Sequence, residues 1–303
     1  MNKLKINLLC LSCFFFVSLY AQNTYNATQI DKDGEKHLIG LSNRSGLLQA
    51  PFQEWFNTNY DAYEIDQKML KKCKGKHKYL TVKIFMGTWC GDSKREIPIF
   101  YKLIDEMGIA EEQITLVNLD QASDRYKQSP TGEEKGLNIH RVPTFIFYQD
   151  QTEIGRIVES PVTNFETDIA QILNGMPTAP NYKGVMMLNE ILNSDTVNLS
   201  QEHLLSMARQ IYREVKNDKE LNTYGYVLKA RQELDKAIAV FEINRMIHPK
   251  VANVYDSLAE AYLEKGNEAA ALFYYKKLVS IEPDNENALA QIKRIDSDAQ
   301  EEE

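Results

Sequence analysis

A pattern of small, large, aromatic and proline residues recurs at a spacing of 34 residues in the C-terminal part of this 303-residue chain. The matched pairs are Gly225 and Ala259, Leu228 and Tyr262, Ala237 and Ala271, Phe241 and Tyr275, and Pro249 and Pro283. Small residues let helices approach closely, aromatic rings fill the groove between them, and proline ends a helix. The period therefore predicts helix–turn–helix units that stack, because one unit cannot bury its own apolar face.

This repeat resembles the tetratricopeptide repeat (TPR) over about residues 217–284. A generic pair of helical hairpins would not require five matched positions in phase. Two repeats are fewer than the ~3 that a free-standing stack needs, so we expect flanking helices at 201–215 and 287–295 to complete and cap it. We predict an all-α TPR-like domain at 200–296, followed by an acidic tail at 297–303.

The first residues of the chain have the pattern of a cleaved export signal. Two lysines precede an apolar stretch at residues 6–17, and Ala21 is a small residue before a polar one. That stretch is short for a membrane span. We interpret 1–21 as a signal peptide and predict an exported protein, periplasmic or secreted. A lipoprotein attached through Cys13 and an uncleaved anchor are the minor alternatives.

Charge and cysteine content exclude several classes of protein. The formal net charge of −8 disfavours nucleic acid or an anionic membrane as a partner. Four cysteines are too few for a disulfide-stapled scaffold, and removal of the signal leaves Cys73 and Cys90. No later segment reaches about 18 consecutive apolar residues, so no transmembrane segment is predicted after signal cleavage.

Between the signal and the repeats, predicted strands alternate with predicted helices. The apolar, β-rich stretches lie at 79–86, 114–119, 142–148 and 153–159, and the helical ones at 93–108 and 165–173. The last two strands flank a short polar turn and form a predicted hairpin. Such an order indicates an α/β sandwich. We assign an N-terminal arm to 22–46, the α/β domain to 47–175 and a linker to 176–199.

A tryptophan–cysteine pair lies where the first of these strands meets a helix. Trp89 and Cys90 follow the strand after a short turn, and a proline interrupts the helix eight residues beyond the cysteine. Val142, Pro143 and Thr144 precede a later strand. This arrangement resembles the thioredoxin fold, in which an aromatic-Cys-x-x-Cys motif begins the second helix and a cis-proline faces the cysteine. The resemblance implies a three-layer α/β/α domain.

The sequence departs from the thioredoxin pattern at three positions within the region of resemblance, about 47–173. Ser93 occupies the position of the second cysteine, and Asp92 replaces the usual proline. Ile84 stands where the family buries a carboxylate that takes the proton of the second thiol. The second thiol and its proton acceptor are thus absent together. This indicates a single-cysteine WCGDS motif, that is, a site that acts through one thiol.

Cys90 is the predicted nucleophile. The N–H groups and dipole of a helix N-terminus favour a thiolate by roughly 1–2 kcal/mol in a partly buried site. The Asp92 charge opposes this by only about 1 kcal/mol in water. Cys73 precedes the strand that Cys90 follows, so about seven strand residues of ~3.3 Å each place the two cysteines ~23 Å apart, beyond the reach of a disulfide. A buried, inert cysteine is the alternative for Cys90.

The resemblance also implies which residues surround the nucleophile. Trp89 would shield Cys90, and the backbone at Val142 and Pro143 would pair with an extended substrate segment. The implied substrate-binding residues are Trp89, Gly91, Asp92, Ser93, Val142, Pro143 and Thr144.

The sequence gives no sign of a metal or a cofactor. The five histidines show no paired metal-ligand spacing. Glycine-rich phosphate-binding motifs do not occur either. We therefore predict no metal site and no cofactor.

Two functions fit these observations. A monothiol can attack a disulfide, but release then requires another thiol. The first hypothesis is therefore a thiol-disulfide oxidoreductase or isomerase that acts on thiol- or disulfide-containing proteins with an external resolving thiol or reductase, while the TPR-like domain contacts a protein partner. The alternative is a redox-inactive adaptor in which the repeats carry the function. The three departures favour the adaptor, whereas the retention of Trp89, Cys90 and Pro143 favours the enzyme.

Overall fold

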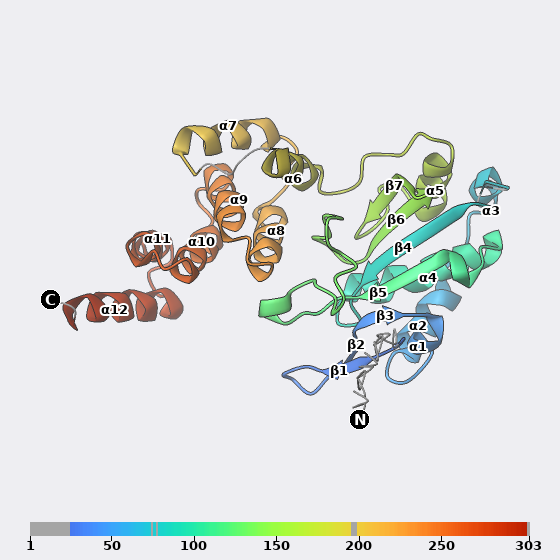
Figure 1. The fold of residues 1–303 in the computed structure, drawn as a ribbon, viewed down its shortest axis with the longest axis horizontal. Helices are drawn as coiled ribbons and strands as arrows, with labels where there is room; N and C mark the ends of the chain where they lie inside the picture. Colours follow the sequence, from blue (N-terminus) through green and yellow to red (C-terminus); the bar gives the residue numbers. More distant parts are fainter. Residues whose placement is uncertain (1–24, 74, 77, 195–198, 302–303) are drawn as a thin grey trace, which may run out of the picture.

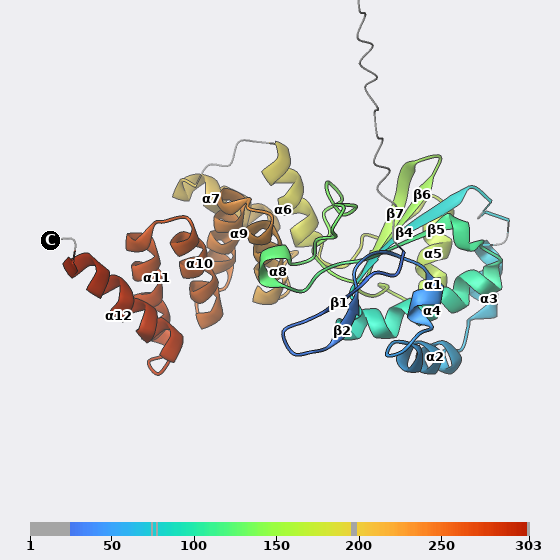
Figure 2. The same cartoon turned by 60° about the horizontal axis from the view of Figure 1, so that its bottom comes forward.

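The computed structural model describes residues 25–301 apart from 74, 77 and 195–198, and it places a sheet-containing part beside an all-helical part (Figures 1 and 2). The segment 1–21, interpreted above as a signal peptide, lies outside the described residues, as does Cys13. None of the helices in the described part of the chain is long and apolar enough to cross a membrane.

The N-terminal part contains seven strands and five α-helices among the described residues. The strands are β1 (Thr28–Ile30), β2 (Lys36–Leu38), β3 (Gly40–Ser42), β4 (Leu80–Met86), β5 (Ile114–Asn118), β6 (Thr144–Gln149) and β7 (Thr152–Val158). The helices are α1 (Arg44–Leu47), α2 (Gln53–Ala62), α3 (Gln67–Leu70), α4 (Gly91–Met107) and α5 (Phe165–Leu173).

A five-stranded mixed sheet of order β3-β5-β4-β6-β7 is the framework of this part. The central strand β4 pairs parallel to β5, with Ile84 opposite Leu116, and antiparallel to β6, with Ile84 opposite Phe145. The sequence of β4 is LTVKIFM, and its last three residues are fully buried. A strand covered on both faces needs such a continuous apolar run. Strands β1 and β2 form a separate hairpin.

Side chains that alternate along β4 divide between two apolar cores. Ile84 belongs to the larger core, to which α2, α4 and α5 contribute. Its neighbour Phe85 belongs to a smaller core on the other face, together with Ile139 and Val142. The segment 119–142, which contains the 3-10 helix η3 (Ser123–Arg125), thus covers the second face of the sheet.

The C-terminal part is built of helices only, within the described residues. They are α6 (Lys183–Ser194), α7 (Gln201–Ile211), α8 (Asp218–Ala230), α9 (Leu234–Ile247), α10 (Ala252–Glu264), α11 (Glu268–Ile281) and α12 (Glu286–Glu301). Helices α8 and α9 pack together as one hairpin, α10 and α11 as the next, and α12 packs on α11 (Figure 1). The predicted sequence of an α/β domain and a helical repeat domain is confirmed.

The repeat positions have clear packing roles. A Cβ atom on Gly225 would lie 2.3 Å from the Phe241 ring, so the first repeat position must be small for α8 and α9 to pack. Ala259, one period later, is fully buried in α10. Pro249 and Pro283 each follow the last turn of a helix, α9 and α11 respectively, where a missing N–H costs nothing.

Helix α6 lies inside the segment 176–199, which we interpreted as a linker. Its Val185, Leu188 and Leu192 are buried in the core of the helical part. The connection without regular structure between α5 and α6 is therefore shorter, residues 174–182. The apolar spacing along α6 explains why it docks, because one face of the helix is covered by α7 and α8.

Candidate functional site

Cys90 lies at the carboxyl end of the central strand and at the start of the longest helix among the described residues. It is the N-cap residue of α4, and its carbonyl accepts the first helical hydrogen bond, from the Lys94 N–H at 3.0 Å. The turn that precedes it is closed by the Cys90 N–H, which donates to the Gly87 carbonyl at 2.9 Å. The side chain is partly exposed. A thiol in this position faces the free N–H groups of the first helical turn, which favour the thiolate.

The thiol contacts the loop that carries the predicted cis-proline. The Val142–Pro143 peptide bond is cis, and the Cys90 thiol donates to the Val142 carbonyl oxygen, with Sγ and O 3.3 Å apart. Val142 is buried, and the Thr144 hydroxyl donates to the Arg141 carbonyl at 2.7 Å. Two segments that are 52 residues apart in sequence therefore meet at the sulfur atom.

Trp89, the residue before Cys90, is held in place by a hydrogen bond and a ring contact. Its indole N–H donates to the Leu119 carbonyl at 2.9 Å, and its ring lies 6.4 Å from that of Tyr126, between centroids. A Cβ atom on Gly87 would lie 2.4 Å from the indole ring, so only glycine fits beside this tryptophan. Our sequence analysis did not single out Gly87 or Tyr126, because neither belongs to the motif itself.

The remaining motif residues have separate roles. Ser93 is fully buried, and its hydroxyl accepts from the Gly87 N–H at 3.3 Å, so it stabilises the turn before Cys90. Asp92 is exposed and pairs with Arg95 at 2.8 Å, which partly offsets its negative charge. An added Cβ at Gly91 would meet no atom within 4 Å, so the first helical position borders open space.

Lys127 is a buried lysine on the Cys90 side of the loop 119–142, and sequence analysis missed it. Its side chain is 3% exposed, donates to the His140 carbonyl at 2.7 Å and lies over the Tyr126 ring. Burial and, to a smaller extent, the positive charge of Arg141 lower the pKa of Lys127 to about 7, against the opposite effect of a negatively charged Cys90. Two nearby carbonyls of the same loop therefore accept these hydrogen bonds: that of His140 from Lys127, and that of Val142 from the Cys90 thiol.

A local backbone contact turns Lys127 inward. The Lys127 N–H donates to the Asp120 carbonyl, and the Asp120 N–H donates to the Gln128 carbonyl, both at 2.9 Å. Lys127 itself has a left-handed φ of 55°. In the sequence this lysine lies in a polar stretch that resembles a solvated loop, so no local pattern could have revealed its burial.

The second cysteine of the described chain has a different environment. Cys73 is 1% exposed, lies in the 3-10 helix η1 (Lys71–Cys73) and precedes β4, whereas Cys90 follows that strand. Both thiols are free. Burial raises the pKa of the Cys73 thiol, so this residue is a poor nucleophile at neutral pH.

No group of three or more histidine, cysteine, aspartate or glutamate side chains that could hold a metal ion is found among the residues that the structure describes.

Comparison with known proteins supports both resemblances. A family model described as thioredoxin matches residues 49–168, and a model described as tetratricopeptide repeat matches residues 252–285. Thioredoxin H9 of Arabidopsis thaliana is 26% identical to this chain over 101 residues, which are 33% of the chain and 65% of that relative. The match thus covers slightly less than two thirds of that protein's length.

Proposed function

Because residues 49–168 form a thioredoxin-like domain and residues 252–285 a tetratricopeptide repeat, we propose that this protein is an exported monothiol oxidoreductase or isomerase. Cys90 is its nucleophile, and the helical domain contacts protein partners. Export rests on the pattern of residues 1–21 alone.

The observation that carries this proposal is the position of the Cys90 sulfur. It is partly exposed, lies at the N-terminus of a 17-residue helix and contacts the Val142 carbonyl. These are the conditions under which a thiolate is stabilised and still reachable. A substrate segment that pairs with the loop at Val142 and Pro143 would bring its own sulfur to Cys90.

The reaction is thiol-disulfide exchange. The Cys90 thiolate attacks one sulfur of a substrate disulfide, a new S–S bond to Cys90 forms, and the other substrate sulfur leaves as a thiolate that takes up a proton. Ser93 cannot release the substrate, because a hydroxyl does not reduce a disulfide and because this side chain is buried. Release therefore needs the second thiol of the substrate, which gives isomerisation, or an external thiol, which gives reduction.

The adaptor hypothesis is favoured by one pair of residues. Ser93 and Ile84, which replace the second thiol and the buried carboxylate of the family, are both 0% exposed and well packed. A domain with these substitutions can serve as a rigid platform for the repeats without any redox reaction.

Alkylation and trapping separate the two functions. In a Cys73→Ser variant Cys90 is the only thiol of the described chain, and we expect it to react readily with iodoacetamide at neutral pH. In the matched Cys90→Ser variant, the buried Cys73 should react far more slowly. We further expect Cys73→Ser to form disulfide-linked complexes with protein substrates in an extract of exported proteins, and Cys90→Ser to form none. An inert Cys90 without captured partners would establish the adaptor.

A further inference from the structure

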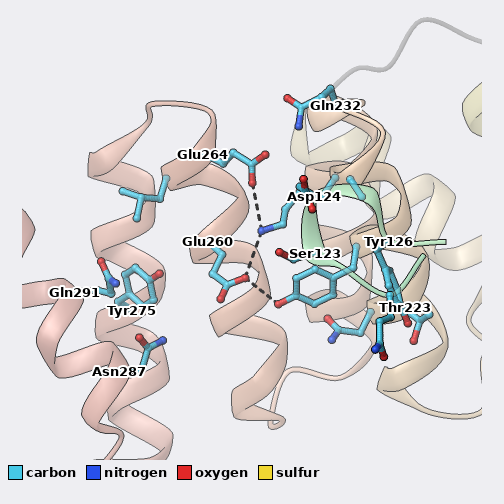
Figure 3. Close-up of a pocket in the computed structure, with 16 residues that line it drawn as sticks. Ser123, Asp124, Tyr126, Thr223, Gln232, Glu260, Glu264, Tyr275, Asn287 and Gln291 are labelled. Carbon is cyan, nitrogen blue, oxygen red and sulfur yellow. Dashed lines mark hydrogen bonds and ion pairs between the residues drawn. The ribbon is translucent and has the colours of Figure 1, made fainter. Parts of the chain in front are cut away.

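A large cleft lies between the thioredoxin-like domain and the helical repeats (Figure 3). Its volume is about 890 Å³. One wall is the loop with η3, and the others are the first helix of each hairpin, α8 and α10, with parts of α11 and α12. The cleft is therefore a composite of both domains rather than a property of the repeats alone.

Direct contacts hold the two walls in place. The Gln128 side chain donates to the carbonyl of Ala230, the last residue of α8, at 2.9 Å. Arg141 donates to the Lys219 carbonyl at 2.9 Å near the start of the same helix. The buried His140 ring packs against Tyr224 of α8, with 6.1 Å between ring centroids. The loop is thus attached at both ends of α8.

The cleft carries uncompensated negative charge. Lys229 is shared between Glu260 at 3.5 Å and Glu264 at 3.3 Å. Across the cleft Asp124 is the acidic residue of the lining, and it pairs with Arg125, which does not line the cleft, at 2.7 Å. The charged side chains of the lining are thus three carboxylates and one lysine. Figure 3 shows Glu260 and Glu264 on one wall and Asp124 on the opposite one.

The rest of the lining suits an extended polypeptide. Side-chain amides can donate to and accept from a peptide backbone whatever its sequence, and tyrosine rings can stack on the cationic groups of lysine and arginine. The amides are those of Gln121, Asn222, Gln232, Asn287 and Gln291, and the rings those of Tyr126, Tyr226 and Tyr275.

We propose that this cleft binds an extended, lysine- or arginine-rich segment of the protein whose sulfur reacts with Cys90. The proposal rests on the function proposed above, because it assigns the segment to the substrate of that site. Its basis is charge complementarity between a cationic segment and a lining that holds three carboxylates, Asp124, Glu260 and Glu264, but only one lysine, Lys229.

The cleft and the sulfur are linked through two aromatic side chains. Tyr126 lines the cleft and contacts Trp89, which precedes Cys90 in the active-site turn. A segment that extends from the cleft past Tyr126 would therefore approach the active-site turn.

Binding is tested first without the thiol chemistry. Two fluorescent peptides of equal length, one with lysines and one with glutamates between glycine and serine spacers, are titrated with the Cys90→Ser protein, and anisotropy is measured. We expect saturable binding of the lysine peptide that weakens with added salt, and about tenfold weaker binding or none for the glutamate peptide.

Matched variants locate the site. The double variant Glu260→Gln and Glu264→Gln keeps the shape and the Tyr226 hydrogen bond acceptor but should weaken lysine-peptide binding about tenfold. A control with Glu54→Gln and Glu106→Gln removes the same charge from exposed positions on α2 and α4 and should bind as the parent does. Equal binding of both peptides, or no effect of the cleft variant, would overturn the proposal.

A second assay links the cleft to Cys90. Each peptide is given a terminal cysteine as a mixed disulfide with 5-thio-2-nitrobenzoate, and release of the coloured thiolate is followed with the Cys90 protein. The lysine peptide should react faster, and the cleft variant should remove that advantage while the rate with 2-hydroxyethyl disulfide, a small uncharged disulfide, is unchanged. If Cys90 does not react even with 2-hydroxyethyl disulfide but the lysine peptide still binds, the proposed function fails and cationic recognition by the cleft stands.

Discussion

At the scale of single residues, the side chains at positions 84 and 127 shape the electrostatic environment of Cys90. Ile84 stands at the position where the resemblance to thioredoxin implies a buried carboxylate, and its buried side chain carries no charge. On the other side of the site, Lys127 brings a buried amine to the backbone segment that also receives the thiol. A protonated lysine is positively charged, whereas a carboxylate is negatively charged. The ammonium group of Lys127 therefore favours a thiolate nearby, which a carboxylate would disfavour.

Replacing Lys127 tests this arrangement through pH. The unfolded chain keeps the lysine protonated up to about pH 10.5 and the folded protein only up to about pH 7. Between these values the unfolded state binds more protons, so the contribution of Lys127 to stability rises with pH, by at most about 5 kcal/mol. We expect Lys127→Met to be more stable than the parent below about pH 7 and to lose this advantage as the pH approaches 10, measured by urea unfolding.

The same variant has a readout at the thiol. Without the ammonium, alkylation of Cys90 at neutral pH should slow severalfold, because the thiolate loses a favourable interaction. The exposed Lys68→Met variant is the control for a general loss of positive charge and should alter neither measurement. An unchanged alkylation rate in Lys127→Met would show that the lysine is structural only.

Ser93→Cys tests whether the lost second thiol is what limits turnover. Position 93 faces the turn before Cys90, one helical turn along α4. A thiol there can attack a mixed disulfide on Cys90, and we expect insulin reduction driven by dithiothreitol to rise about tenfold. Ser93→Ala serves as the control for loss of the hydroxyl. The same low rate in Ser93→Cys as in the parent would mean that the surroundings do not support redox chemistry.

At the scale of elements, the helical hairpins are held by a close approach of helices rather than by helix propensity. Gly225 lies in the interior of α8, where glycine is intrinsically unfavourable by about 1 kcal/mol relative to alanine. Glycine compensates for this cost because the absence of a Cβ atom leaves room for the Phe241 ring of α9. The two rings of Tyr226 and Phe241 then pack edge to face, with 5.4 Å between centroids.

Gly225→Ala should therefore destabilise the protein in spite of the better helix former. The new methyl group would clash with the Phe241 ring, and overpacking of this kind costs about 1–3 kcal/mol in the free energy of unfolding. Adding Phe241→Leu should recover part of the loss, because the smaller side chain frees the space. Thermal or urea unfolding that shows Gly225→Ala to be more stable than the parent would contradict this account.

At the scale of the whole molecule, the domain interface contains a buried histidine. His140 lies between Tyr182 and Tyr224, with ring centroids 5.7 and 6.1 Å away. Burial lowers the pKa of His140 to about 3, with a contribution from the positive charges of Lys127, Arg141 and Arg156 and against a hydrogen bond to the Asn138 carbonyl. The folded protein therefore keeps this ring neutral at pH values where the unfolded chain protonates it.

Acid should weaken the domain interface through His140. Between about pH 6.5 and pH 3 the unfolded state binds one more proton than the folded state. The free energy of unfolding therefore decreases as the pH is lowered, by about 1.4 kcal/mol per pH unit. His140→Phe preserves the ring contacts and should lose about 2 kcal/mol less than the parent between pH 7 and pH 5, measured by urea unfolding. His203→Gln, in α7, should retain the parent's slope, and equal slopes in His140→Phe and the parent would refute the assignment.

The features predicted from the sequence are those that contiguous residues encode. The strand that precedes Trp89 and Cys90 and the helix that follows them are patterns of neighbouring residues, and each unit of the 34-residue repeat is itself a contiguous segment. Backbone sterics and burial act on these patterns locally. Both family resemblances are therefore carried by the sequence alone.

The surroundings of the sulfur and the cleft beside it depend on contacts between distant segments. Gln128 and Ala230 are 102 residues apart, and Cys90 and Val142 are 52 apart. Lys127 lies in a polar stretch whose composition suggests a solvated loop, and His140 is a lone histidine of a type that is usually on the surface; both are buried, His140 against Tyr224 of the helical domain. Local preference cannot encode such burial, since the free energy that compensates it comes from partners far along the chain.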